Sequence, residues 1–274
     1  MNNIGIISGG GKLPIAIGSR LIKKNYNVVF FVIEEYFVSE FYKNLEVQII
    51  NLHSAKKIIQ LFQSKTIDSI IMAGHITRPS LSDLSFDFQT LKLAKNILLN
   101  KTGDNDLLLT LKNFFKDNGF NYFDWKDHCL DLFATQDNLT ITKPSSLAKK
   151  NLNKALLVFK NYGKLDVGQS IIVQNQIILG LEAVEGTDNL ISRCKDLKKS
   201  GDQGILVKFA KYKQSKILDV PTIGLETIKL LKENDYEGIY LEKNNCLMLD
   251  KQKTIKLADQ NKIFISTCKK IEEK

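Results

Sequence analysis

Two short loops rich in glycine and basic residues are the parts of the sequence best suited to bind phosphate. Residues 8–14 read Ser-Gly-Gly-Gly-Lys-Leu-Pro and follow an apolar run. Glycines where a strand passes into a helix let backbone N–H groups approach a phosphate, and the helix N-terminus favours negative charge. Lys12 adds a positive charge. The spacing matches neither GxGxxG nor a Walker A loop, so a tight strand-to-helix turn is the alternative interpretation.

The second loop, residues 73–79, reads Ala-Gly-His-Ile-Thr-Arg-Pro and also follows an apolar run. In an open α/β sheet, ligands bind beyond the carboxyl ends of the strands. We therefore expect His75 and Arg78 to face the same ligand as the glycine loop. The Arg78 guanidinium suits phosphate because it donates two parallel hydrogen bonds. The alternatives are a His75 bonded to backbone and an Arg78 in a surface salt bridge.

An acidic stretch at residues 182–188, Glu-Ala-Val-Glu-Gly-Thr-Asp, is dense in oxygen ligands and backbone donors. Mg²⁺ takes one or two carboxylates together with water and substrate phosphate, so the stretch predicts a magnesium site. Capping of the next helix by Thr187 or Asp188 is the alternative. A two-metal phosphoesterase site does not fit, because the chain has only three histidines and no GNH or GHxH pattern.

Two further aspartates stand where a carboxylate has either a structural or a functional use. Asp104, in the Gly-Asp-Asn-Asp stretch at 103–106, is placed to cap a helix or to bind a ligand. Asp219 lies between apolar residues just before Pro221. A carboxylate there is costly unless it is paired or bound to metal. A cap formed by Asp219 or Thr222 is the alternative.

The elements that position these residues alternate between strand and helix in the first half of the chain. This alternation predicts a parallel sheet with helices on both faces. The alternation is lost over residues 120–144, and we place a domain boundary near residues 135–146. The predicted strands of this half are 3–8, 27–33, 47–50 and 67–73, and the predicted helices are 13–24, 54–64, 89–100 and 104–117.

The second half of the chain again predicts strands and helices, with two hairpins. One hairpin turns near Gln174–Asn175 and the other near Asn244–Asn245. The predicted strands are 170–173, 176–184, 204–210, 238–241, 246–249 and 263–266, and the predicted helices are 151–162, 187–198, 222–233 and 251–260.

Composition narrows the class of protein. The chain has 274 residues and a net charge of +9, which suggests anionic partners or a lysine-rich bias on solvated faces. No basic block interleaved with aromatics occurs, which argues against nucleic acid. The N-terminus does not read as a signal peptide, and no apolar stretch is long enough to span a bilayer, so we expect a cytoplasmic or membrane-peripheral protein. The four cysteines, far apart and without CxxC, indicate free thiols.

Six of these stretches, in order, resemble the UDP-2,3-diacylglucosamine pyrophosphatase family of the lipid A pathway, of the type unrelated to calcineurin-like phosphoesterases. They are residues 9–14, 73–79, 103–104, 166–169 (Asp-Val-Gly-Gln), 182–188 and 219–224 (Asp-Val-Pro-Thr-Ile-Gly). The resemblance implies an α/β protein. A Rossmann-like parallel-sheet domain at 1–135, a linker at 136–150 and a C-terminal α/β catalytic domain with a mixed sheet at 151–274 are expected, with the ligand between the domains.

The resemblance also implies a reaction and the residues that carry it. The expected reaction is Mg²⁺-dependent hydrolysis of UDP-2,3-diacylglucosamine to UMP and 2,3-diacylglucosamine 1-phosphate, at the cytoplasmic face of the inner membrane. Asp219 matches the family's catalytic aspartate, and with Glu185 or Asp188 it is expected to hold the metal. A homodimer is a further expectation. Residues expected to line the substrate are Gly10, Gly11, Lys12, Leu13, Gly74, His75, Arg78, Gly103, Asp104, Gln169, Glu185, Gly186, Thr187, Asp188, Lys208 and Thr222.

One departure from the family pattern concerns the approach to Asp219. The family often carries Gln-Asp-x-Arg-x-Asp, whereas residues 214–219 read Gln-Ser-Lys-Ile-Leu-Asp. Lys216 is the neighbouring positive charge that remains. A non-catalytic nucleotide-sugar-binding regulatory module is the alternative to an enzyme. A Rossmann oxidoreductase fits less well, because GxGxxG is absent even though Glu34–Glu35 follows the second strand.

Overall fold

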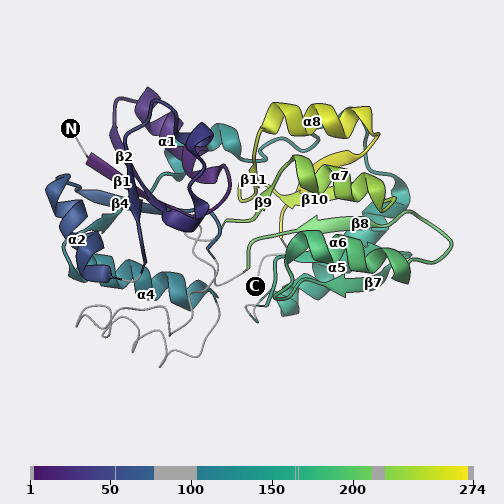
Figure 1. Cartoon of the computed structure of the whole chain (residues 1–274). Helices are drawn as coiled ribbons and strands as arrows, with labels where there is room; N and C mark the ends of the chain where they lie inside the picture. Colours follow the sequence, from purple (N-terminus) through teal and green to yellow (C-terminus); the bar gives the residue numbers. More distant parts are fainter. Residues whose placement is uncertain are drawn as a thin grey trace. The chain divides into compact units, whose positions relative to one another are not determined.

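The computed structural model describes residues 3–52, 54–76, 104–163, 165, 167–211 and 220–270, with only the backbone for 104–108. The chain forms two compact units, Met1–Cys129 and Leu130–Lys274, and each is described by itself (Figure 1). No helix in the described ranges has both the length and the apolar character that a bilayer span requires.

The first unit is built on a parallel sheet, as the sequence predicted, but the sheet has a fifth strand in the stretch after residue 120 where no strand was predicted. Its strands run in the order β3-β2-β1-β4-β5. The order reverses beside β1, and in open α/β sheets such a switch point is where ligands bind. The strands are β1 (Asn3–Ser8), β2 (Asn27–Ile33), β3 (Val47–Ile50), β4 (Ser69–Ala73) and β5 (Asn121–Tyr122).

Helices cover both faces of this sheet because successive strand residues point to opposite sides. The Phe30 ring in β2 packs against Gly18 of α1 (Leu13–Lys23). The neighbouring Phe31 ring lies 4.4 Å from the Phe62 ring of α2 (Ala55–Ser64). Helix α4 (Asp104–Asp117) packs against α2 through the stacked rings of Phe115 and Phe62. The predicted helix at 89–100 lies outside the described residues.

Local sequence signals account for the ends of these elements. Ser54 caps α2 by accepting a hydrogen bond from the Lys57 backbone N–H at 3.4 Å. A proline stands in the first turn of α1, where its missing N–H costs nothing. Short 3-10 turns follow at Glu34–Tyr36, Ser39–Tyr42 and Lys126–His128.

The second unit has a mixed five-stranded sheet, in the order β12-β10-β8-β6-β7. Strands β12, β10 and β8 are parallel, and β6 is antiparallel to both β8 and β7. The strands are β6 (Ser170–Gln174), β7 (Ile177–Leu181), β8 (Ile205–Lys208), β10 (Gly238–Glu242) and β12 (Phe264–Cys268).

Each face of the second sheet has its own apolar core. On one face, α5 (Ser146–Tyr162) packs its Phe159 against Ile171 and Val207. On the other face, Ile172 and Leu206 meet residues from three helices. Those helices are α6 (Gly186–Cys194), α7 (Leu225–Glu233) and α8 (Lys251–Gln260) (Figure 1). Short 3-10 turns lie at Leu130–Leu132 and Lys195–Leu197.

One of the two predicted hairpins forms, and the other does not. Strands β6 and β7 pair antiparallel around Asn175 and Gln176, which both adopt positive φ. Residues 238–241 and 246–249 do not pair. Strand β10 is occupied on both sides by β8 and β12, while β11 (Leu247–Met248) pairs in parallel with β9 (Thr222–Ile223) in a separate two-stranded sheet.

Two helix starts also differ from prediction. Residues 222–223 are strand β9 rather than helix, because they pair with β11, and α7 begins only after Gly224. Helix α5 begins at Ser146 rather than at 151. Its N-cap is Ser145, whose hydroxyl accepts from the Ala148 backbone N–H at 3.0 Å. Glu237 in turn holds the Ser145 hydroxyl at 2.9 Å.

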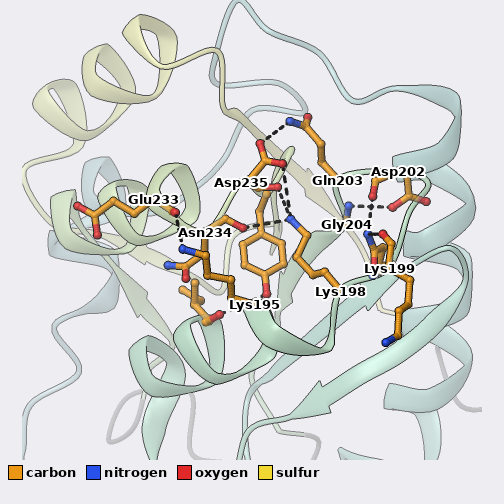
Figure 2. Close-up of polar contacts among 12 residues, drawn as sticks. Lys195, Lys198, Lys199, Asp202, Gln203, Gly204, Glu233, Asn234 and Asp235 are labelled. Carbon is orange, nitrogen blue, oxygen red and sulfur yellow. Dashed lines mark hydrogen bonds and ion pairs between the residues drawn. The ribbon is translucent and has the colours of Figure 1, made fainter.

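A polar network fixes the segment that leads into β8. The Asp202 carboxylate accepts from the Asn151 side chain at 3.1 Å and from the backbone N–H groups of Asn175 and Gly204 at 3.0 and 2.8 Å. Nearby, the Lys198 ammonium donates to the Asn234 carbonyl at 3.1 Å, at the end of α7 (Figure 2). The network ties the start of β8 to α5 and to the β6–β7 turn.

The last described strand, β12, has a hydrogen-bonded neighbour on each side. Strand β12 pairs with β10 on one side. On the other, the Leu139 N–H donates to the Ile265 carbonyl at 2.9 Å, and the Thr267 N–H donates to the Asp137 carbonyl at 2.9 Å. A segment from the beginning of this unit therefore runs along its final strand.

Candidate functional site

Two loops meet at the carboxyl edge of the first sheet. Residues 9–11 follow β1, and residues 74–75 follow β4. The Gly10 N–H donates to the His75 carbonyl at 2.8 Å, and the His75 N–H donates to the Gly10 carbonyl at 3.1 Å. The Gly9 N–H donates to the Ala73 carbonyl at 2.9 Å. The two loops are thus hydrogen-bonded to each other at the switch point of the sheet. The sequence predicted them at this edge because one follows β1 and the other follows β4.

The close contact between these loops leaves no room for a Cβ at Gly9, Gly10 or Gly74. Gly74 has φ +91°, and a Cβ there would lie 2.7 Å from the Gly10 carbonyl oxygen. A Cβ on Gly10 would lie 2.3 Å from the His75 ring. The imidazole therefore lies on the glycine loop, where it also makes an edge contact with the Tyr36 ring at 5.3 Å.

The N-terminus of α1 lies at the same edge. Lys12 is exposed and stands at the N-cap of the helix, and Leu13 is the first helical residue. The helix start and the lysine together favour an anion. Of the other residues predicted for this unit, Arg78 and Gly103 lie outside the described residues, and Asp104 is described only as the first backbone position of α4.

The second unit gathers polar side chains at one edge of its sheet. Lys208, at the end of β8, is in register with Ser170 at the start of β6. The Lys208 ammonium donates to the Thr187 hydroxyl at the start of α6, and Thr187 donates to Glu182 Oε1 at 3.2 Å. The Ser170 hydroxyl lies 3.2 Å from that of Thr187. Lys208 is only 5% exposed.

Glu182 joins this cluster to the loop before β6. Its Oε2 accepts from the Gln169 backbone N–H at 3.3 Å. A Cβ on Gly168 would overlap the Glu182 carbonyl, so the two backbones touch. The Tyr162 hydroxyl donates to the same carbonyl. Burial raises the Tyr162 pKa to about 12, and the carboxylates of Glu182 and Glu185 add to the rise.

The charged side chains of this cluster are not matched in ion pairs. Among the described residues, Lys208 forms no ion pair with a carboxylate; its partner is the neutral Thr187 hydroxyl. Asp188, at the start of α6, has a pKa raised mainly by desolvation and further by Glu226 and Glu182, while Lys208 opposes the rise. A buried ammonium that contacts no carboxylate in the described part of the chain is costly, so an anionic ligand would be favoured here.

Glu185, the third predicted metal ligand, is engaged within the protein. Arg193 Nη2 lies 2.8 Å from its Oε1, and the Ala183 N–H donates to its Oε2 at 3.2 Å. The Arg193 hydrogen bond lowers the Glu185 pKa. Within the described ranges, no three His, Cys, Asp or Glu residues are grouped to hold a metal ion. Asp219 lies outside those ranges.

The capping alternatives for Thr187 and Thr222 find no support in their hydrogen bonds. The N-cap of α6 is Glu185, which makes no side-chain cap, and the Thr187 hydroxyl is turned to Glu182 and Lys208. The Thr222 hydroxyl donates to the Val220 carbonyl at 2.9 Å, and α7 has Gly224 as its N-cap. Gly186 adopts φ +78° at the first position of α6.

Two family models together match nearly all of the chain. The LpxI N-terminal domain matches residues 3–132, and the LpxI C-terminal domain matches residues 135–266. The chain belongs to the LpxI family. It is 26% identical over 272 residues to the UDP-2,3-diacylglucosamine pyrophosphatase LpxI of Caulobacter vibrioides (strain ATCC 19089 / CIP 103742 / CB 15), and the match covers 97% of each chain.

For this member of the LpxI family, sequence reasoning missed residues that hold the predicted ones in place. Glu182 had been noted in its motif but not as a member of the site. Its signal was a carboxylate at the end of an apolar strand, where burial demands hydrogen-bond partners. The remaining partners are Ser170, Tyr162 and Arg193, and no local pattern marked them.

Proposed function

We propose that this chain hydrolyses the pyrophosphate bond of UDP-2,3-diacylglucosamine, giving UMP and 2,3-diacylglucosamine 1-phosphate in lipid A biosynthesis. The full-length match to a relative named for that activity carries the proposal. The two polar sheet edges support it, because each offers a feature that suits an anion: the start of α1 with Lys12, and the buried ammonium of Lys208.

The residues of the chain divide the work by their chemistry. Lys208, buried and bonded to a neutral hydroxyl, offsets negative charge on the pyrophosphate oxygens. Lys12 and the first turn of α1 bind a second negatively charged group through the charge of the helix N-terminus. Arg78 donates to a phosphate, and Asp219 is the catalytic carboxylate.

Mg²⁺ is the metal we propose, and the described carboxylates fit it in part. Asp188 would be one ligand, because its carboxylate is in no ion pair among the described residues. Asp219 would be the other. Glu185 fits less well, since a metal there would compete with Arg193. When bound, Mg²⁺ would neutralise charge on the phosphoryl oxygens.

We further propose that the enzyme works at the cytoplasmic face of the inner membrane, as a peripheral protein and as a homodimer. A substrate with two acyl chains resides in the bilayer, so the enzyme must reach the membrane surface. The net charge of +9 supports attraction to anionic lipid headgroups.

The deciding experiment measures UMP release from UDP-2,3-diacylglucosamine in detergent with Mg²⁺. Wild type, Asp219→Ala and an EDTA-treated sample are compared. We expect metal-dependent turnover that falls at least ~100-fold in Asp219→Ala, since a positioned catalytic group contributes about that much. Asp117→Ala, which removes an exposed carboxylate at the end of α4, should match wild type. Substrate binding without turnover in the wild type would instead favour a regulatory module.

A further inference from the structure

The buried carboxylate of Glu182 links two loops of the candidate site. Glu182 is 9% exposed and follows the last residue of β7. Its two oxygens accept from different segments: Oε1 from the Thr187 hydroxyl and Oε2 from the Gln169 backbone N–H. A single carboxylate therefore holds together the loop before β6 and the first turn of α6.

These contacts fix the direction in which the Thr187 hydroxyl points. A hydroxyl has one proton to donate, and an ammonium can only donate. Thr187 must therefore accept from Lys208 and give its own proton elsewhere. Glu182 Oε1 and the Ser170 hydroxyl both lie 3.2 Å away; the charged carboxylate is the stronger acceptor, and Ser170 can donate to Thr187 in turn. Hydrogen bonds to a charged acceptor are stronger than neutral ones, so the carboxylate holds the hydroxyl more firmly than an amide would.

The same arrangement keeps the positive charge of Lys208 available. A direct ion pair with Glu182 would neutralise the ammonium, whereas the Thr187 hydroxyl stands between the two charges. The carboxylate still stabilises the buried lysine through the polarised hydroxyl. We infer that Glu182 is a positioning residue: it orients Thr187, which holds the Lys208 ammonium for the pyrophosphate oxygens of the substrate. This inference rests on the proposed hydrolysis.

The test uses Glu182→Gln, Thr187→Val, the double variant and Thr187→Ser in the full chain. The matched control is Glu237→Gln. The Glu237 carboxylate also accepts from one backbone N–H and one hydroxyl, those of Ser145, at 2.7 and 2.9 Å. It precedes β10, so it lies at the opposite edge of the sheet from Lys208. The Glu237→Gln variant therefore measures how the loss of a similarly bonded carboxylate affects folding, without a change near Lys208.

We expect Glu182→Gln and Thr187→Val each to lower kcat for UMP release about tenfold with KM changed less than about threefold, because charge stabilisation is lost in the transition state. The double variant should have a kcat within about twofold of the slower single variant, because both substitutions act through the same contact. Thr187→Ser should restore most of the rate. A rate for Glu182→Gln equal to that of Glu237→Gln, or effects that multiply in the double variant, would overturn the inference.

A second readout separates this inference from the proposed function. If the wild type releases no UMP, the proposed function fails, and calorimetric titration with inorganic pyrophosphate decides the role of Glu182. Affinity about tenfold weaker in Glu182→Gln than in Glu237→Gln supports positioning, by the same loss of charge stabilisation. Equal affinities, or no binding by the wild type, overturn it. If Glu182→Gln does not fold, Thr187→Val against Thr187→Ser decides by the same criteria.

Discussion

Gly74 and Gly119 share a left-handed backbone but differ in what surrounds them. Their φ values are +91° and +92°. A Cβ on Gly74 would meet the backbone of the glycine loop at 2.7 Å, whereas nothing lies within 4 Å of one on Gly119. We expect Gly119→Ala to lower the free energy of unfolding by about 1 kcal/mol from backbone strain alone. Gly74→Ala should cost about 3 kcal/mol, because the clash adds to the strain.

Urea unfolding of both variants beside the wild type measures the difference. The Gly119 variant is the control, since it carries the strain without the clash. Equal losses in the two variants would mean that the loops separate easily, and that the contact between Gly10 and His75 does not depend on glycine.

The Glu185–Arg193 pair predicts a dependence of stability on pH. The Glu185 pKa in the folded protein lies below its ordinary value of 4.5. A lowered carboxyl pKa gives stability that is complete above the ordinary value and is lost as pH falls through the folded-state value. The side chains are 24% and 45% exposed, so Glu185→Gln should cost only about 0.5 kcal/mol at neutral pH.

Thermal unfolding at neutral pH and at about pH 3 compares Glu185→Gln with wild type, and the difference should shrink at the acid end. The exposed pair of Glu46 and Lys65, joined by one contact of 3.0 Å, provides the control Glu46→Gln, with a smaller expected loss. A difference for Glu185→Gln that stays constant with pH would contradict the lowered pKa.

At the scale of single residues, the sequence was informative about chemical type and silent about partners. Glycines before a helix and a histidine after a strand marked the first sheet edge, because strand ends in a parallel sheet share one side. Thr187 was named from its motif. Its bonds to Lys208 and Glu182 depend on which strands lie side by side, and a motif does not contain that.

Among the elements, the two hairpin predictions separate local from long-range causes. Asn175 and Gln176 tolerate positive φ, and β6 and β7 have each other as neighbours. Asn244 also has positive φ, yet the strand before it is buried along its whole length and pairs on both sides. A turn residue predicts that the chain reverses. Which strand then pairs with the strand before the turn depends on how that strand is buried in the sheet.

Asp202 offers a test of an element that shapes the fold away from the candidate site. Asp202→Ala removes acceptors for Asn151, Asn175 and Gly204 and should cost about 3 kcal/mol, because buried donors lose their partners. It precedes β8, whereas Lys208 ends that strand, so kcat for UMP release should not change.

Chemical unfolding and UMP release measure the two effects on Asp202→Ala, with the exposed Asp196→Ala as the control for removing a nearby carboxylate. A loss of kcat that accompanies full folding would show that the start of β8 affects the far end of the strand. Stability equal to that of the control would show that the hydrogen bonds of Asp202 contribute little.

For the whole molecule, the net charge of +9 predicts salt-sensitive attachment to anionic membranes. Charge attraction at a surface is screened beyond about 8 Å at physiological ionic strength. In co-sedimentation, the protein should bind vesicles that contain phosphatidylglycerol at low salt and be released as salt rises. Vesicles of neutral phosphatidylcholine are the control. Binding that is the same on both vesicles and at all salt concentrations would contradict an electrostatic attachment.

The arrangement of the second unit also bears on how it is made. Of the described strands, β12 is synthesised last, yet both β10 and the segment at 137–139 pair with it. While the ribosome is still adding residues 263–268, both of these partners expose unpaired backbone groups. A chain ended prematurely before Ile263 would keep those edges open for good, and open edges pair with other chains. Aggregation of truncated products is therefore the expected cost of closing the unit with its final strand.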